Sequence, residues 1–236
     1  MKKAALILLC GLFLSALYGC GGSSSAPDTA PAGESSAAAG KPAESSGEDS
    51  IASGPKYEAC VKKGNVYESE MLNLKFTLPE GWVFLTDEEI LELNQKFGYQ
   101  TIEEMVSTDK MIMDMAAWKD GSYPRMTVQF SNNSSNGLDK EYTTQEIAEK
   151  SRESQAERHT TGPVKSFTLD DGTEYYYFTA QEDMNDDSGR TFYNTNVMRS
   201  LGRYTLLIQY SGFENDFETA ILPQFASITE TPQNNS

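Results

Sequence analysis

The chain has 236 residues, with 19 Lys and Arg against 35 Asp and Glu, and a formal net charge of −16. Charge alone therefore does not draw it to nucleic acid or to an anionic lipid surface, and it favours cations or basic partners. With one histidine and three cysteines, the chain is poorly supplied for a histidine-based catalytic set, a zinc site or several disulfides.

The first predicted element is a short apolar run. Lys2 and Lys3 precede an apolar stretch at 4–17, which is shorter than the ~20 residues that span a bilayer. It ends in Leu17-Tyr18-Gly19-Cys20, and this stretch resembles the lipobox of bacterial lipoprotein signals. The resemblance implies cleavage before Cys20, a lipid on its thiol, and anchoring at the extracytoplasmic face of the cell membrane. The alternative is an ordinary signal peptide with an incidental cysteine.

Residues 1–19 are thus predicted to be a signal peptide, and residues 20–59 a lipidated cysteine with a linker. Cleavage before Cys20 removes Lys2 and Lys3 and changes the formal net charge to 17 − 35 = −18. Residues 21–55 are mainly Ser, Ala, Gly, Pro and Glu, a composition that does not fold. As a coil this linker would span about 30–35 Å, which fits a Gram-positive surface and also a periplasm. Cys60 remains as a lone thiol, which we expect to be inert and partly buried; an intermolecular disulfide is the alternative.

A single α+β domain is predicted over residues 60–229, followed by a polar tail at 230–236. Alternating apolar residues predict a hairpin of strands at 65–69 and 72–78, and a short extended segment at 82–85. Thr86 with Glu89 forms a capping box for a helix that ends at Gly98. Thr101 with Glu104 predicts a second capping box, at the start of a shorter helix.

The second half of the domain is predicted to be mostly strands. Two strands at 111–118 and 126–131 precede a helix that opens at Thr143 with Glu146 and runs to about His159. Four further strands form a meander, at 164–169, 174–181, 191–199 and 204–210. A last helix is predicted from Ser211, with Phe217, Ile221 and Phe225 at helical spacing and Pro223 bending or ending it early.

The fold class follows from strands that are apolar on both faces, for example Tyr175-Tyr176-Tyr177-Phe178. In a sheet with one solvent-exposed face, apolar and polar residues would alternate more regularly along each strand. We therefore predict a largely antiparallel sheet with helices on both faces, an α/β/α sandwich.

The residues from Val66 to the sequence Pro79-Glu80-Gly81-Trp82 resemble the PsbP-like family, in which a hairpin leads to an extended segment with this pattern. The resemblance in element order reaches to Ile228. It implies an α/β/α fold and a role as an adaptor that binds other proteins, and it provides no catalytic residues.

Several residues are candidates for a catalytic or metal site. His159 stands among charged residues near a helix end, where a structural role is favoured over a catalytic one. Asp183, Asn185 and Asp187 alternate as in a calcium loop, but the closing position is Asn194 and not Glu. An acidic hairpin turn is therefore the favoured interpretation, and a weak cation site the alternative.

Two further groups of residues are candidates for a binding or catalytic site. Six aromatic residues could form a stacking platform, although their alternation favours a core: Tyr175, Tyr176, Tyr177, Phe178, Tyr193 and Tyr204. The pairs Glu88-Glu89 and Glu103-Glu104 fall in first helical turns, where they favour the helix dipole; we interpret them as caps rather than as an acid and base.

The favoured function is a membrane-anchored, non-enzymatic binding or adaptor module, held by lipid on Cys20, with a protein partner and without a cofactor or nucleic acid. The alternatives are a surface hydrolase that uses carboxylates and a solute-binding receptor of a transporter. Paired carboxylates in one cleft would favour the hydrolase, and two lobes would favour the receptor.

Overall fold

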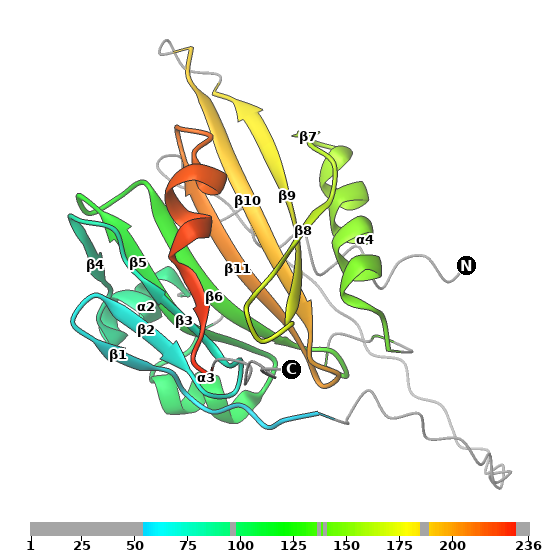
Figure 1. The fold of residues 1–236 in the computed structure, drawn as a ribbon. Helices are drawn as coiled ribbons and strands as arrows, with labels where there is room; N and C mark the ends of the chain where they lie inside the picture. The colour runs from blue at the N-terminus through cyan, green and yellow to red at the C-terminus, as the bar shows by residue number, and fades with distance from the viewer. Residues whose placement is uncertain (1–53, 95–97, 136–137, 139–140, 185–188, 230–236) are drawn as a thin grey trace, which may run out of the picture.

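The structure is a computed structural model that describes residues 54–94, 98–135, 138, 141–184 and 189–229. It confirms a mixed α+β fold dominated by antiparallel sheets (Figure 1). An eight-stranded sheet has the order β4-β5-β6-β11-β10-β9-β7, with β8 also paired to β9, and a four-stranded sheet has the order β1-β2-β3-β12. Among the described residues, no helix has the length and apolar character needed to cross a bilayer.

The large sheet contains every strand predicted after residue 81. Its strands are β4 (Trp82–Phe84), β5 (Met111–Lys119), β6 (Arg125–Asn132), β7 (Thr160–Thr161), β8 (Lys165–Thr168), β9 (Glu174–Asp183), β10 (Thr191–Ser200) and β11 (Tyr204–Gly212). All of its pairs are antiparallel.

Burial on both faces of this sheet is confirmed at β9. Tyr175 and Tyr177 join the main core cluster, whereas Phe178 and Ala180 join a second cluster beneath α4.

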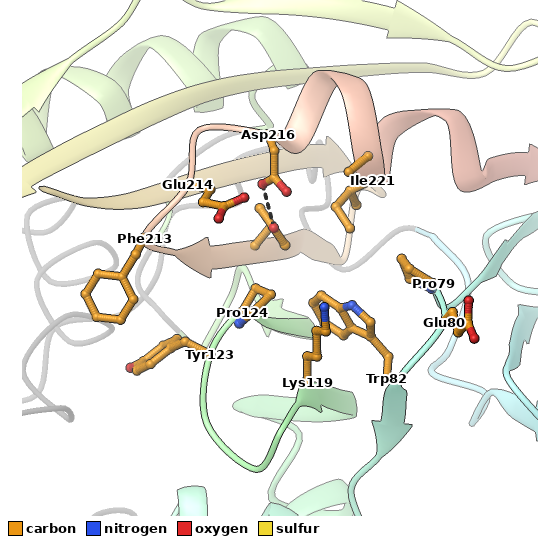
Figure 2. A pocket seen from close by; sticks show the side chains of 12 residues that line it. Pro79, Glu80, Trp82, Lys119, Tyr123, Pro124, Phe213, Glu214, Asp216 and Ile221 are labelled. Carbon is orange, nitrogen blue, oxygen red and sulfur yellow. Dashed lines mark hydrogen bonds between the residues drawn. The ribbon is translucent and has the colours of Figure 1, made fainter. Parts of the chain in front are cut away.

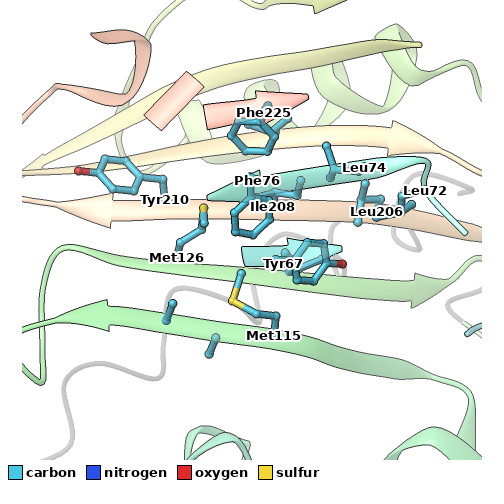
Figure 3. Close-up of a cluster of buried hydrophobic side chains, with 14 of the residues drawn as sticks. Tyr67, Leu72, Leu74, Phe76, Met115, Met126, Leu206, Ile208, Tyr210 and Phe225 are labelled. Atoms are coloured by element: carbon cyan, nitrogen blue, oxygen red, sulfur yellow. The ribbon is translucent and has the colours of Figure 1, made fainter. Parts of the chain in front are cut away.

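The small sheet contains the predicted hairpin as β2 and β3. Its strands are β1 (Val61–Lys63), β2 (Val66–Ser69), β3 (Leu74–Thr77) and β12 (Phe225–Ser227). The main core is shared by both sheets: Tyr67, Phe76 and Phe225 from the small sheet lie over Leu206 and Ile208 of β11 (Figure 3). Because one core unites the two sheets, the described residues are not divided into two lobes.

Three helices follow the predicted caps. They are α2 (Asp87–Leu93), α3 (Ile102–Thr108) and α4 (Thr144–Ala156). Complete capping boxes are present at Thr86 and Thr143. At α3 the box is incomplete, because Thr101 accepts from the Glu104 amide while the Glu104 carboxylate accepts from the Gln100 amide.

The helix predicted after Ser211 is wrong. β11 continues through Ser211 to Gly212, and a π-helical turn (η2, Phe217–Ile221) and a 3-10 turn (η3, Leu222–Gln224) precede β12. Phe217, Ile221 and Phe225 are all buried. Their spacing therefore identified buried residues, although these residues do not lie on an α-helix. Pro223, in the first turn of η3, lacks the N–H that a continuing α-helix needs.

Candidate functional site

A cavity of about 340 Å³ lies at one end of the large sheet. It is bounded by the turn before β4, the β5–β6 turn, the end of β11 and the η2 turn (Figure 2). Its lining residues are Pro79, Glu80, Trp82, Lys119, Tyr123, Pro124, Tyr210, Phe213, Glu214, Asp216, Ala220 and Ile221. This volume is at the small end of the range for ligand pockets.

The floor of the cavity is aromatic. Trp82 is 8% exposed and stacks on Tyr210, with ring centroids 6.1 Å apart. Among the described residues, no acceptor forms a hydrogen bond with the indole N–H of Trp82, and this nitrogen is not an enclosed atom. The indole N–H can therefore donate to a ligand that enters the cavity with an acceptor oxygen.

The rim of the cavity is acidic. Tyr210 donates its hydroxyl proton to Asp216 Oδ1 at 2.6 Å. Burial, followed by this hydrogen bond and the negative charges of Asp216 and Glu214, raises the pKa of Tyr210. Glu80 and Glu214 are exposed, and Lys119 is the cation among the lining residues. Three carboxylates and one ammonium give the cavity a formal charge of −2.

Local sequence places two of these walls. Gly81 has a φ of +84°, which the turn before β4 requires, and the Trp82 amide closes this turn by donating to the Pro79 carbonyl at 3.2 Å. Asp216 begins the η2 turn, and its carbonyl accepts from the Thr219 and Ala220 amides. The π-helical turn thus carries Asp216, Ala220 and Ile221 to the cavity.

Guanidinium groups already lie on aromatic rings beside the cavity. Arg125 lies over the Tyr123 ring at 5.3 Å, and Arg190 lies over the Phe213 ring at 4.1 Å. Tyr123 and Phe213 also pack edge to face, with centroids 5.9 Å apart. The aromatic surface at this end of the sheet therefore accommodates cations.

A second polar cluster holds the first described residues of the chain. The Asp114 carboxylate accepts from the hydroxyls of Tyr57 and Tyr67, both at 2.7 Å, and from the Cys60 amide at 3.1 Å. Burial, followed by the negative charge of Asp114, raises the pKa of the Cys60 thiol to about 12. The cluster is enclosed by the protein's own groups, which explains it as structural and agrees with an inert Cys60.

The structure does not bring the candidate residues from the sequence together in one site. His159 follows α4, and its Nδ1 lies 3.7 Å from a Glu182 carboxylate oxygen. Asp183 accepts from the Thr191 hydroxyl at 2.8 Å, while Asn185 and Asp187 lie outside the described residues, as does the lipidation candidate Cys20. The described residues contain no group of three or more His, Cys, Asp or Glu positioned to hold a metal ion.

The core interpretation of the aromatic residues is confirmed for Tyr175, Tyr177, Phe178 and Tyr204, which are buried. Tyr176 and Tyr193 are half-buried. The first-turn positions of Glu88-Glu89 and Glu103-Glu104 are also confirmed. The sequence placed Trp82 only in the stretch that resembles the PsbP-like family, and it identified none of Trp82, Tyr210 and Asp216 as a site residue, because only the tertiary fold brings the end of β11 to this stretch.

Comparisons with known proteins returned no matching family and no similar curated protein. Among solved structures, the cyanobacterial PsbP protein (CyanoP) of Synechocystis has 13% identity and a TM-score of 0.39, and covers 78% of this chain and 98% of its own. The Ran-binding protein Mog1p of Saccharomyces cerevisiae has 10% identity and a TM-score of 0.35, with 69% and 94% covered. Likenesses this distant carry no argument about function.

Proposed function

We propose that this protein is a membrane-anchored, non-enzymatic binding module that engages a protein partner at the cavity around Trp82. The observation that carries the proposal is the cavity itself, which joins a buried aromatic floor to an exposed acidic rim. Aromatic residues are enriched where proteins bind partners.

The chemistry of the lining favours binding over catalysis. The lining residues include no histidine, cysteine, serine or threonine, so the cavity lacks a nucleophile activated by a histidine base. Its three carboxylates keep the carboxylate hydrolase as the second candidate. Asp216, the least exposed carboxylate of the three, is engaged by the Tyr210 hydroxyl. The carboxylates suit recognition of positive charge, in agreement with the acidic composition of the chain.

The anchor remains part of the proposal. Its support is the sequence Leu17-Tyr18-Gly19-Cys20, which resembles a lipobox. Two or three acyl chains on Cys20 would give stable anchoring, whereas a single chain would be marginal. We expect Cys20→Ala to accumulate as an uncleaved precursor that carries no lipid. Normal processing and normal lipid labelling of this variant would contradict the anchor.

Site-directed photo-crosslinking on intact cells tests the binding function. A photoreactive residue replaces Glu80 on the cavity rim in one variant, and in a matched control it replaces Glu153 on α4. Both positions are exposed, and α4 packs on the sheet face opposite the main core. We expect a discrete crosslinked species from position 80 only. Equal crosslinking from both positions, or none from position 80, would reject the cavity as the binding site.

A further inference from the structure

We propose that the cavity receives a single cationic side chain, a lysine or arginine of the partner protein, whose adjacent backbone carbonyl accepts the Trp82 indole N–H. This inference rests on the proposed function and names the chemistry that the site recognises. Three observations carry it: the charge of the lining, the unpartnered indole donor, and the aromatic rings that already hold guanidinium groups.

The residues that line the cavity carry a formal charge of −2, which favours a cation, and the guanidinium groups of Arg125 and Arg190 at its edge offset part of this charge. Glu80, Glu214 and Asp216 outnumber Lys119 among the lining residues. Asp216 Oδ1 accepts from Tyr210, and no described residue donates to the other carboxylate oxygen. A charged donor that enters the cavity would find this oxygen beside the aromatic floor, where partial desolvation strengthens the attraction.

The aromatic floor suits the same group. Cations bind best on the face of a tryptophan and also on tyrosine. Trp82 and Tyr210 form a stacked pair, and Trp82 lies across the cavity from Glu214 and Asp216 (Figure 2). The methylene stem of lysine or arginine is apolar and packs on such rings while the charged head stays near the rim. At the edge of the cavity, the guanidinium groups of Arg125 and Arg190 lie over the rings of Tyr123 and Phe213.

The indole N–H restricts the ligand further. A bare metal ion or simple ammonium offers no acceptor for this donor, whereas a peptide carbonyl does. Lys119 has the opposite effect, because its ammonium repels an entering cation. We therefore expect that neutralising a carboxylate weakens binding and that neutralising Lys119 strengthens it. Purely structural roles for these residues would not produce such opposite changes in affinity.

The test uses residues 20–236 with Cys20→Ser and Trp118→Phe, so that Trp82 is the remaining tryptophan of the two. The probes are the blocked tripeptides acetyl-Gly-Lys-Gly-amide and acetyl-Gly-Arg-Gly-amide, and a norleucine counterpart that keeps the apolar stem without the charge. Trp82 fluorescence is followed up to about 20 mM peptide. If Trp118→Phe does not fold, calorimetric titration of the chain with both tryptophans replaces fluorescence.

We expect saturable binding of at least one cationic peptide, with norleucine about tenfold weaker or more. Asp216→Asn and Glu214→Gln should each weaken binding about twofold to fivefold, and Lys119→Gln should strengthen it by a similar factor. Asp216→Asn retains an oxygen that can accept from Tyr210, so the fold is kept. The matched control Glu153→Gln on α4 should change nothing.

Equal binding of norleucine, the absence of saturable binding, or a Lys119→Gln variant that binds more weakly would each overturn the inference. These failures are distinguishable from failure of the proposed function. Crosslinking from position 80 with no preference for cationic peptides would reject the cation and keep the binding site. Loss of crosslinking from position 80 would reject the site itself.

Discussion

Replacing Asp114 by alanine should destabilise the protein by about 3 kcal/mol. The carboxylate accepts three hydrogen bonds, from Tyr57, Tyr67 and the Cys60 amide. Tyr67 is 0% exposed, so the bond from its hydroxyl is worth about 1.5–3 kcal/mol, and the other two, which are partly exposed, about 0.5–1.5 kcal/mol each. Relief of the desolvation of a carboxylate that is 7% exposed offsets part of this sum.

Thermal unfolding, followed by circular dichroism, measures this effect. For a domain of this size, 3 kcal/mol corresponds to a Tm lower by about 6–12 °C. Glu153→Ala on the exposed face of α4 is the matched control and should stay within about 0.5 kcal/mol of the parent. An Asp114→Ala variant with the Tm of this control would refute the reasoning.

A double-mutant cycle separates the buried hydroxyl from the rest. Tyr67→Phe removes the donor that Asp114→Ala leaves without an acceptor, so the two losses should not add. We expect the double variant to be more stable than the sum of the single losses predicts, by about 1–2 kcal/mol. Strict additivity would show that the two groups do not interact.

Three further predictions concern reactivity, pH and packing. With a thiol pKa raised from 9.0 to about 12, Cys60 should hold about a thousandfold less thiolate than an ordinary thiol at pH 8, so Ellman's reagent should react far more slowly before unfolding than after; equal rates would contradict this. Burial would raise the pKa of Asp109, but hydrogen bonds from Tyr204 and Arg203 and the charge of Arg203 lower it overall. Its stabilisation should therefore be present above the ordinary pKa of 3.8 and lost as pH falls through the lowered value. The cost of Asp109→Asn in urea unfolding should be larger at neutral pH than near pH 2.5, and a pH-independent cost would count against it. Phe225→Ala should cost about 3 kcal/mol, because Phe225 is 9% exposed and packs on Phe76, Phe167 and Phe217; a loss below about 1 kcal/mol would show that β12 is not needed to close the core.

Local signals explain the parts of the fold that could be predicted. The hairpin of β2 and β3 is set by alternation, and the starts of α2 and α4 are set by Thr86 and Thr143, which bond to groups three residues away. The buried face of β11, which carries Leu206, Ile208 and Tyr210, was likewise visible in its alternation. Each of these signals comes from residues that are close together in the chain, so a single sequence is sufficient to identify it.

The remaining features depend on distant pairing. β12 lies beside β3, with Phe225 opposite Phe76, and no local pattern indicates that partner. Apolar spacing at Phe217 and Ile221 identified buried residues but not the backbone that carries them, because a π-helical turn can bury the same side chains as an α-helix. The cavity was not predicted, because its walls come from separate segments: the turn before Trp82 is a local feature, whereas Asp216 reaches it through the tertiary fold.

The most direct test of the central claim is crosslinking from position 80 after the cavity has been filled. Ala220 lines the cavity and is partly buried, so Ala220→Phe places a ring in the space that the partner would occupy. Circular dichroism first establishes that the variant is folded. The account predicts that the crosslinked species from position 80 disappears in Ala220→Phe and persists in a chain that carries Glu153→Gln. An undiminished crosslink in the folded Ala220→Phe variant would contradict it.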